Sequence, residues 1–218
     1  YINKPYTAKE LLLRITNLIA WSRAQRHSNP LTGLPGNPSI EAQVDQRLRG
    51  EEAFAFLYAD LDNFKVFNDY YSYAAGDGVI KLIAQTLQEV VAEIGGPQDF
   101  VGHVGGDDFV VISTPDRAQE IANEVVSRFD SRILDHYRPE DRERGAVMVE
   151  NRQGEMAEFG FVGVTIALVE SDRYQIEHKA MLNDIVAELK NQGKSIPGSC
   201  MVRDRRQPTP HLRTGSDG

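Results

Sequence analysis

Two pairs of aspartates stand where a fold could bring several carboxylates together. Asp60 and Asp62 lie at the end of a nearly continuous apolar run, and Asp107 and Asp108 lie between two shorter apolar runs. Mg²⁺ prefers oxygen ligands, and proteins usually supply one or two carboxylates while substrate phosphates supply further oxygens. Two such ions form the arrangement used for in-line displacement at phosphorus. The four aspartates therefore indicate metal-assisted phosphoryl chemistry, provided that the two pairs meet in space.

The apolar run "AFAFLYAD", residues 53–60, predicts a central strand that ends at Asp60. In extended backbone every second side chain points to the same face, so Asp62 shares the face of Asp60. A sheet that places the second pair beside this strand end would bring carboxylates from distant parts of the sequence together.

The second pair lies in "VGHVGGDDFVVIS", residues 101–113, which predicts a β-hairpin whose tip is Gly105-Gly106-Asp107-Asp108. We expect Gly105 and Gly106 to permit positive φ and to let a phosphate or base approach the backbone, because they lack a side chain. The alternative is a type I′ turn with solvated aspartates, since Gly and Asp are common in hairpins. The tetrapeptide by itself leaves both interpretations open.

The remaining periodic segments predict a mixture of helices and strands. Helices are expected over 39–49, 63–71, 77–94, 116–135 and 176–191, and further strands over 146–150, 157–161, 161–169 and 199–203. The segment "SYAAGD" is expected to separate the second and third of these helices. Because the elements do not alternate strictly as β-α-β, the pattern favours an α/β (α+β) fold whose sheet contains antiparallel pairs.

Composition narrows the classes of function. The chain has 218 residues, a net charge of −8 and a pI near 5.2, which argues against nucleic-acid binding through a basic surface. The single cysteine, Cys200, cannot form an intrachain disulfide, and we expect a cytoplasmic protein. No apolar run approaches the roughly 20 residues that span a bilayer, so no membrane partner is expected. The chain begins with Tyr1 rather than Met, as an excised fragment would.

Three regions are predicted along the chain: the end of a preceding domain with a connector helix over 1–27, a main domain over 28–203 and a polar, disordered tail over 204–218. In the connector, Thr7 and Glu10 form a capping box at the start of a helix. Its apolar stripe comprises Leu11, Leu12, Ile15, Leu18 and Ile19. The stripe fits either a helix packed on its own domain or a connector that pairs with a second copy.

The stretch "YADLDNFKVFNDYYSYAAGDGVIKLIAQTL", residues 58–87, and the hairpin together resemble the GGDEF family, the diguanylate cyclases. The resemblance runs from "PLTGLPGN" to "ELKNQGKS", about residues 30 to 195, and its D-x-D-x-F-K-x-x-N-D run is specific. It implies a nucleotide-cyclase palm with a mainly antiparallel central sheet flanked by helices. It also implies an enzyme that, as a homodimer, joins two GTP molecules into cyclic di-GMP.

The same resemblance implies roles for individual residues. Asp60, the carbonyl of Leu61, and Asp107 match the ligands of Mg²⁺ or Mn²⁺. Asp108 matches the signature position that is tied to catalysis at the attacking 3′-hydroxyl.

Other matching positions contact the nucleotide. The positions that meet its phosphates are Asn63 and Phe64 through backbone N–H groups, and Lys65, Lys190 and Lys194 through their charge. Asn68 and Asp77 match the pair that hydrogen-bonds guanine. A carboxylate can accept from guanine N1–H and N2–H₂, which adenine does not offer together.

Several positions depart from the family pattern. The signature reads Gly-Gly-Asp-Asp-Phe, so Asp108 is one methylene shorter than the usual glutamate, and a misplacement of about 1 Å at a reacting centre can cost about 100-fold. His103 and Lys194 stand where arginine is frequent, Tyr73 replaces a histidine, and Gly96 replaces the arginine of an inhibitory R-x-x-D motif.

These departures keep two alternatives to a cyclase open. One is a catalytically degenerate domain that senses GTP or cyclic di-GMP, and the other is a pure dimerisation module. Upstream, "YINKPYTAKELLLRI" resembles the end of a bacterial receiver domain, which implies a response regulator whose receiver precedes this domain.

Overall fold

The computed structural model describes residues 7, 9, 11–16, 28–150, 155–173 and 176–205. Its central sheet has five strands in the order β2-β3-β1-β6-β7. These strands are β1 (Ala55–Asp62), β2 (Phe100–Gly105), β3 (Asp108–Ser113), β6 (Gly163–Glu170) and β7 (Cys200–Arg203). All neighbouring pairs are antiparallel except β6 and β7, which confirms the expected mainly antiparallel sheet.

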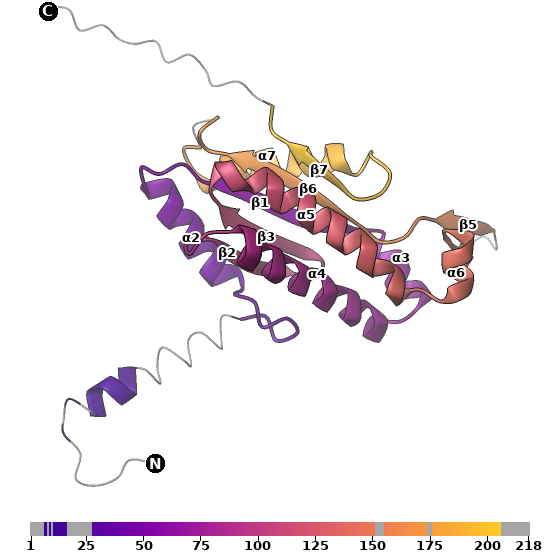
Figure 1. Ribbon diagram of the computed structural model, residues 1–218, viewed down its shortest axis with the longest axis horizontal. Coiled ribbons are helices and arrows are strands. Elements are labelled where there is room, and N and C mark those ends of the chain that lie inside the picture. Colours follow the sequence, from indigo (N-terminus) through magenta and orange to yellow (C-terminus); the bar gives the residue numbers. More distant parts are fainter. Residues whose placement is uncertain are drawn as a thin grey trace, which may run out of the picture.

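Helices cover both faces of this sheet (Figure 1). The helices are α2 (Asn37–Arg49), α3 (Phe64–Tyr70), α4 (Tyr73–Ile94), α5 (Pro115–Ile133), α6 (Pro139–Arg144) and α7 (Lys179–Gly193), with a 3₁₀ turn η1 (Leu134–His136). Helices α4 and α5 pack on one face, whereas α2 and α7 pack on the other. A separate hairpin, β4 (Val147–Glu150) and β5 (Met156–Phe159), lies at the same end of the molecule as α3 and α6.

The continuous apolar run of β1 is explained by burial on both faces. Ala55, Leu57, Ala59 and Leu61 join the core under α4 and α5, while Phe56 joins the core under α2 and α7. Because side chains alternate along a strand, positions 56, 58, 60 and 62 all face α2 and α7. The two aspartates at the end of β1 are therefore directed toward α7.

Three local predictions need correction. Helix α4 begins at Tyr73 rather than at residue 77, because Ser72 caps it by accepting from the backbone N of Ala75. Most of "SYAAGD" is thus the first turn of a helix rather than a separator. The hairpin tip contains only Gly106 and Asp107, since Asp108 already belongs to β3. Helix α6 lies in a segment for which no helix was predicted.

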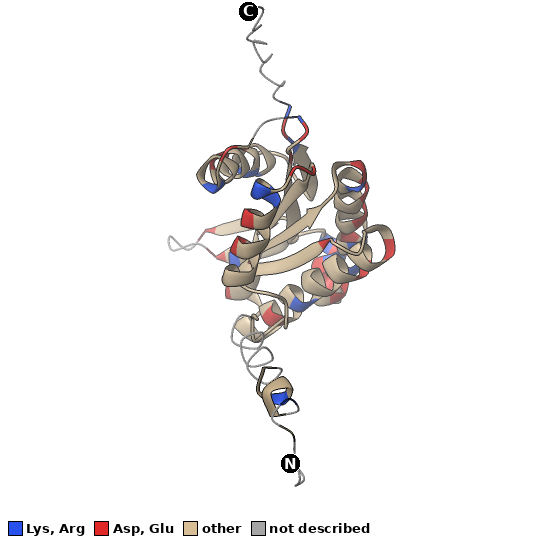
Figure 2. Ribbon diagram, turned by 90° about the vertical axis from the view of Figure 1, so that its left-hand side faces the viewer, with Lys and Arg blue, Asp and Glu red and all other residues tan. Residues whose placement is uncertain are grey.

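Charged residues lie mainly on the helices, while the strands of the sheet are mostly uncharged (Figure 2). Within the described residues, no helix is long and apolar enough to cross a membrane. Residues 11–16 are helical, in agreement with the predicted connector helix. The receiver-like residues 1–6, the stripe residues Leu18 and Ile19, and residues 206–218 of the expected tail lie outside the described part.

Candidate functional site

Asp60 and Asp108 are direct neighbours across β1 and β3. The ammonium of Lys190, on α7, lies between them, with its Nζ 2.7 Å from Asp60 Oδ2 and 2.9 Å from Asp108 Oδ1. Lys194 Nζ lies 3.2 Å from Asp60 Oδ1. Because Lys190 and Lys194 are one helical turn apart, they approach the same strand end from α7. The tertiary structure thus joins four of the predicted site residues in one charged cluster.

Burial and charge act in opposite directions in this cluster. Burial favours a neutral Asp60, but the hydrogen bonds to Lys190 and Asp108, together with the charges of Lys190 and Lys194, outweigh it and hold the pKa of Asp60 below its ordinary value. Burial raises the pKa of Asp108, and the neighbouring Asp60 raises it further despite the charge of Lys190. A raised pKa makes Asp108 the better proton acceptor of the two.

Tyr58 is a contact that the sequence analysis missed. It lies two residues before Asp60 on the same face of β1, and Lys190 Nζ lies 4.5 Å from the centre of its ring. Burial, followed by the charge of Asp108, raises the pKa of Tyr58 to about 12, so its hydroxyl stays protonated near neutral pH. The strand alternation that places Asp62 beside Asp60 could have identified Tyr58 as well.

Asp62 is held by the neighbouring strand. Thr165, on β6, donates its hydroxyl to Asp62 Oδ2 at 2.6 Å and is itself fully buried. Burial raises the pKa of Asp62, and this hydrogen bond only partly offsets that effect. Asp62 therefore has a fixed protein partner, whereas Asp60 faces the lysines.

A hollow of about 490 Å³ lies beside the turn from β1 to α3. Its walls include six of the predicted ligand residues, namely Leu61, Asn63, Phe64, Lys65, Asp107 and Lys194. The backbone N of Leu61 donates to the carbonyl of Asp107 at 3.3 Å, which joins the hairpin tip to the end of β1. The fold thus brings together residues that are separated by up to 133 positions (194 − 61).

Asn63 connects β1 to α3 in a left-handed conformation, with φ 61° and ψ 10°. This conformation is uncommon for residues other than glycine, although Asn tolerates it better than most. Its side-chain amide donates to the carbonyls of Gly160 and Phe161 at 3.4 Å each. Strained backbone that the surroundings hold in place is frequent at ligand sites.

The hairpin needs both Gly105, at the end of β2, and Gly106, in its tip. Gly105 has φ 147° and Gly106 has φ 59°, and a Cβ on either would meet nothing within 4 Å. The expected positive φ is confirmed, and the open space leaves the backbone accessible. His103 fixes the tip, because its Nε2 donates to the Gly106 carbonyl at 3.1 Å and its Nδ1 lies 3.0 Å from the Thr32 hydroxyl.

Asn68 and Asp77 lie on α3 and α4, on either side of the turn that joins these helices. Asn68 Oδ1 is buried and has no hydrogen-bond partner among the described residues. A Cβ on Gly76 would lie only 1.7 Å from this oxygen, so the glycine provides the space for the Asn68 amide. A buried acceptor without a protein partner fits an atom that a bound molecule satisfies.

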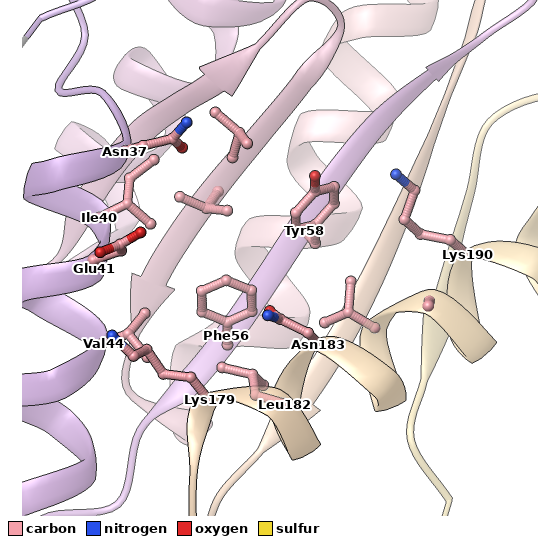
Figure 3. Close-up of a pocket in the computed structure, with 14 residues that line it drawn as sticks. Asn37, Ile40, Glu41, Val44, Phe56, Tyr58, Lys179, Leu182, Asn183 and Lys190 are labelled. Atoms are coloured by element: carbon pink, nitrogen blue, oxygen red, sulfur yellow. The ribbon is translucent and has the colours of Figure 1, made fainter.

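A second hollow, of about 500 Å³, lies between α2 and α7, and Lys190 forms part of its wall (Figure 3). Its walls are mainly apolar and include Ile40, Phe56 and Leu182. The ion pair of Lys179 with Asp45, at 3.1 Å, joins the two helices beside it. Lys190 therefore separates an apolar hollow from the carboxylate cluster.

The end of β1 offers a buried oxygen to a divalent cation. Asp60 Oδ1 is buried, and its contact with Lys194 lacks hydrogen-bond geometry, so this oxygen remains available to a ligand. The described residues contain no group of three or more His, Cys, Asp or Glu side chains that could hold a metal. A cation at this position would thus depend on Asp60 and Asp107, on the main-chain carbonyl of Leu61 and on the phosphates of a ligand. Mg²⁺ is usually held by one or two carboxylates together with substrate phosphates.

Comparison with known proteins places these features in a family. The model of the family described as "Diguanylate cyclase, GGDEF domain" matches residues 26–157, more than half of the chain. The diguanylate cyclase TpbB of Pseudomonas aeruginosa is 36% identical over 95 residues, which cover 42% of this chain and 21% of TpbB. The bifunctional diguanylate cyclase/cyclic di-GMP phosphodiesterase MucR of the same organism is 29% identical over 178 residues, 78% of this chain and 22% of MucR.

A solved structure shows the same fold. The coiled coil and GGDEF domain of DgcB from Caulobacter crescentus, in complex with c-di-GMP, superposes with a TM-score of 0.60 at 18% identity and covers 90% of this chain and 95% of that one. By contrast, the matched region spans less than a quarter of TpbB and of MucR.

Proposed function

This chain belongs to the GGDEF family of diguanylate cyclase domains, and from that premise we propose that it joins two GTP molecules into cyclic di-GMP. The observation that carries the proposal is the hollow beside Asp60, whose walls combine Asp107, Lys65 and Lys194 with the turn at Asn63. Carboxylates for a cation and lysines for phosphate oxygens are the two chemical requirements of a nucleoside triphosphate site.

In the proposed complex, Asp60, the carbonyl of Leu61, and Asp107 hold Mg²⁺ or Mn²⁺. The cation neutralises the phosphates when it is bound. Lys65 and Lys194 balance the remaining charge of the phosphates. The backbone N–H groups of Asn63 and Phe64 orient the phosphate groups. Gly105 and Gly106 leave the backbone of the tip open to the ligand.

Asn68 and Asp77 select the base. The unpartnered amide oxygen of Asn68 and the exposed carboxylate of Asp77 supply acceptors for the N–H groups of guanine. A site built for these donors rejects a base that lacks them, because its own polar groups are then left unpaired. GTP should therefore bind more tightly than ATP, and Asp77→Ala should remove most of that preference.

Asp108 is the residue that we assign to the chemical step. Each reaction forms a bond from a ribose 3′-hydroxyl oxygen to the α-phosphorus of the second GTP and releases pyrophosphate, and the hydroxyl proton passes to Asp108. The raised pKa of Asp108 suits this role. Two facing copies of the domain are needed, since each supplies one GTP.

A second candidate is a GTP sensor without cyclase activity. It is favoured by one observation: Asp108 is short and already bound by Lys190 at 2.9 Å. Incubation with GTP and Mg²⁺ or Mn²⁺, followed by chromatography of the products, separates the two. Cyclic di-GMP and pyrophosphate support the cyclase, whereas saturable GTP binding without product supports the sensor.

The wider context is also a proposal. We infer a cytoplasmic response regulator in which the main domain, over 28–203, follows a receiver domain and a connector helix, and in which residues 204–218 form a tail. The receiver would set how often two copies face each other, because only a pair of domains can present two GTP molecules.

A further inference from the structure

Residues 134–145, which form η1 and α6 and are called the bridging segment here, lie against the helices that carry Asn68 and Asp77. Its one buried carboxylate is Asp141, which is only 2% exposed. Tyr71 donates its hydroxyl to Asp141 Oδ2 at 2.5 Å, and Tyr70 donates to Oδ1 at 3.2 Å. The guanidinium of Arg144 also pairs with Asp141, with its Nη1 3.0 Å from Asp141 Oδ1. A buried carboxylate is costly unless it is paired, so these bonds hold Tyr70 and Tyr71 firmly at the end of α3.

Aromatic packing adds to this attachment. The ring of Tyr137 lies 5.2 Å from that of Phe67 and 5.6 Å from that of Tyr71, both edge to face. Its hydroxyl accepts from the backbone N of Val162 at 2.7 Å, which ties the bridging segment to the chain just before β6. The guanidinium of Arg138 lies 5.1 Å from the centre of the Tyr71 ring.

The bridging segment also touches α4. A Cβ on Gly78 would lie 3.2 Å from His136 Cε1, so the imidazole packs on the helix directly beside Asp77. The segment therefore contacts α3 just after Asn68 and α4 just after Asp77. It spans the two helices whose separation fixes the distance between the amide and the carboxylate.

Helix α3 needs such support, because it has seven residues. Isolated helices of that length are not stable in water, and their position depends on tertiary contacts. We infer that the bridging segment determines guanine selectivity, with Asp141 and Tyr71 as positioning residues that hold Asn68 at the correct distance from Asp77. The inference rests on the proposed function, because it assumes that Asn68 and Asp77 bind the base.

The test measures selectivity rather than activity. Dissociation constants for GTP, for ITP, which lacks the 2-amino group of guanine, and for tripolyphosphate are measured by calorimetry with Mg²⁺. The proteins are the wild type, Tyr71→Phe, Asp141→Asn and a control, Arg128→Gln. The control also loses a charged contact to α4, the 2.6 Å pair of Arg128 with Glu93, but from a position that lies outside the bridging segment.

We expect the preference for GTP over ITP to fall by about tenfold in Tyr71→Phe and in Asp141→Asn, the cost of one impaired hydrogen bond to the base. Affinity for tripolyphosphate should not change in either variant, and the control should keep the preference of the wild type. Asp141→Glu, which retains the charge, should lose less selectivity than Asp141→Asn.

Other outcomes overturn the inference in distinguishable ways. If folded Tyr71→Phe keeps the full preference, or if tripolyphosphate affinity falls together with that for GTP, the bridging segment has only a structural role. If the wild type itself binds ITP and ATP as tightly as GTP, the proposed guanine site is wrong. Should Asp141→Asn fail to fold, Tyr71→Phe decides alone, because it removes only one hydroxyl.

Discussion

Asp108 differs from the usual glutamate by one methylene and stands beside Asp60 at the start of β3. It was expected at an exposed tip, but only 28% of its side chain is exposed, because Lys190 covers it. The antiparallel register decides this, since the residue that follows Asp107 is already paired with β1. The contact with Lys190 leaves the carboxylate bound from the α7 side.

Replacing Asp108 with glutamate should bring the carboxylate closer to the reacting 3′-hydroxyl without changing its charge. Asp108→Glu should raise cyclic di-GMP synthesis by about tenfold, which corresponds to about 1.36 kcal/mol of activation free energy. GTP affinity should hardly change, because the proposed base and phosphate contacts come from other residues. The rate is measured under saturating GTP, with dimer formation verified. An inactive variant that binds GTP normally would favour the sensor.

Lys190 holds two carboxylates that would otherwise repel each other. Lys190→Met should lower the free energy of unfolding by about 2–4 kcal/mol, somewhat less than for a fully buried pair because Asp108 is partly exposed. Mg²⁺ without nucleotide should recover part of this loss in urea titrations, because it neutralises Asp60 in place of the ammonium. Lys194→Met is the control and should cost less, since 52% of the Lys194 side chain is exposed. Equal losses would contradict this account.

His103 should make stability depend on pH. Burial lowers its pKa below the ordinary value of about 6.5, so the unfolded chain binds the proton more readily than the folded one. Stability is then complete above the unfolded pKa and decreases as the pH falls toward the folded pKa. His103→Gln should flatten this slope between about pH 5 and 7. Urea unfolding at several pH values tests this, and an unchanged slope would show that His103 does not cause it. His136 also has a lowered pKa, so part of the slope should remain.

At the scale of elements, the position of α7 is set by its close contact with β6. A Cβ on Gly193 would lie 2.3 Å from Thr165 Cγ2, so α7 can approach the sheet only because residue 193 has no side chain. This approach brings Lys190 to the end of β1. The glycine is therefore needed for packing rather than for backbone conformation.

Gly193→Ala should move α7 away from β6 and cost about 1–3 kcal/mol of stability, as overpacking of a core does. The shift should also weaken the contact of Lys190 with Asp60. Thr165→Ser removes the clashing methyl and keeps the hydroxyl that binds Asp62. In that background Gly193→Ala should cost clearly less, as a double-mutant cycle by urea unfolding would show. If the losses of stability from the two substitutions were additive, the added methyl group would not clash with Thr165.

At the scale of the whole molecule, the connector carries an uncovered apolar surface. Leu12, Leu13 and Ile15 are 69%, 63% and 46% exposed, and they lie on the part of the predicted connector helix that is described. Among the described residues, the other exposed large apolar side chains are isolated in sequence. We predict that this surface pairs with a second copy, because exposed apolar patches mark interaction surfaces.

The chain should accordingly form a dimer whose formation depends on Leu12 and Ile15. The double substitution Leu12→Lys with Ile15→Lys should shift it toward monomer in sedimentation velocity experiments. Cyclic di-GMP synthesis should fall with the dimer fraction, while GTP affinity per chain should not change. A monomeric variant with full synthesis would refute the requirement for two facing domains.

Local sequence determined much of the architecture. The apolar run ending at Asp60 and the hairpin around Gly105 and Gly106 were predictable, because strand periodicity and turn chemistry depend on neighbouring residues. Helix boundaries were less predictable: α4 starts four residues earlier than expected, since the Ser72 cap was not recognised. Six of the residues that the family resemblance assigned to ligand binding line the hollow beside β1.

Tertiary structure alone decided which of these residues meet. The bridging of Asp60 and Asp108 by Lys190 depends on strand register and on the close approach of α7 at Gly193. The contact of Tyr71 with Asp141 depends on the path of a segment 70 residues further along the chain. Periodicity and turn signals report the local backbone, whereas these contacts arise from packing between distant segments. That is the physical reason why the sequence could propose members of the site but could not give the contacts that each of them makes.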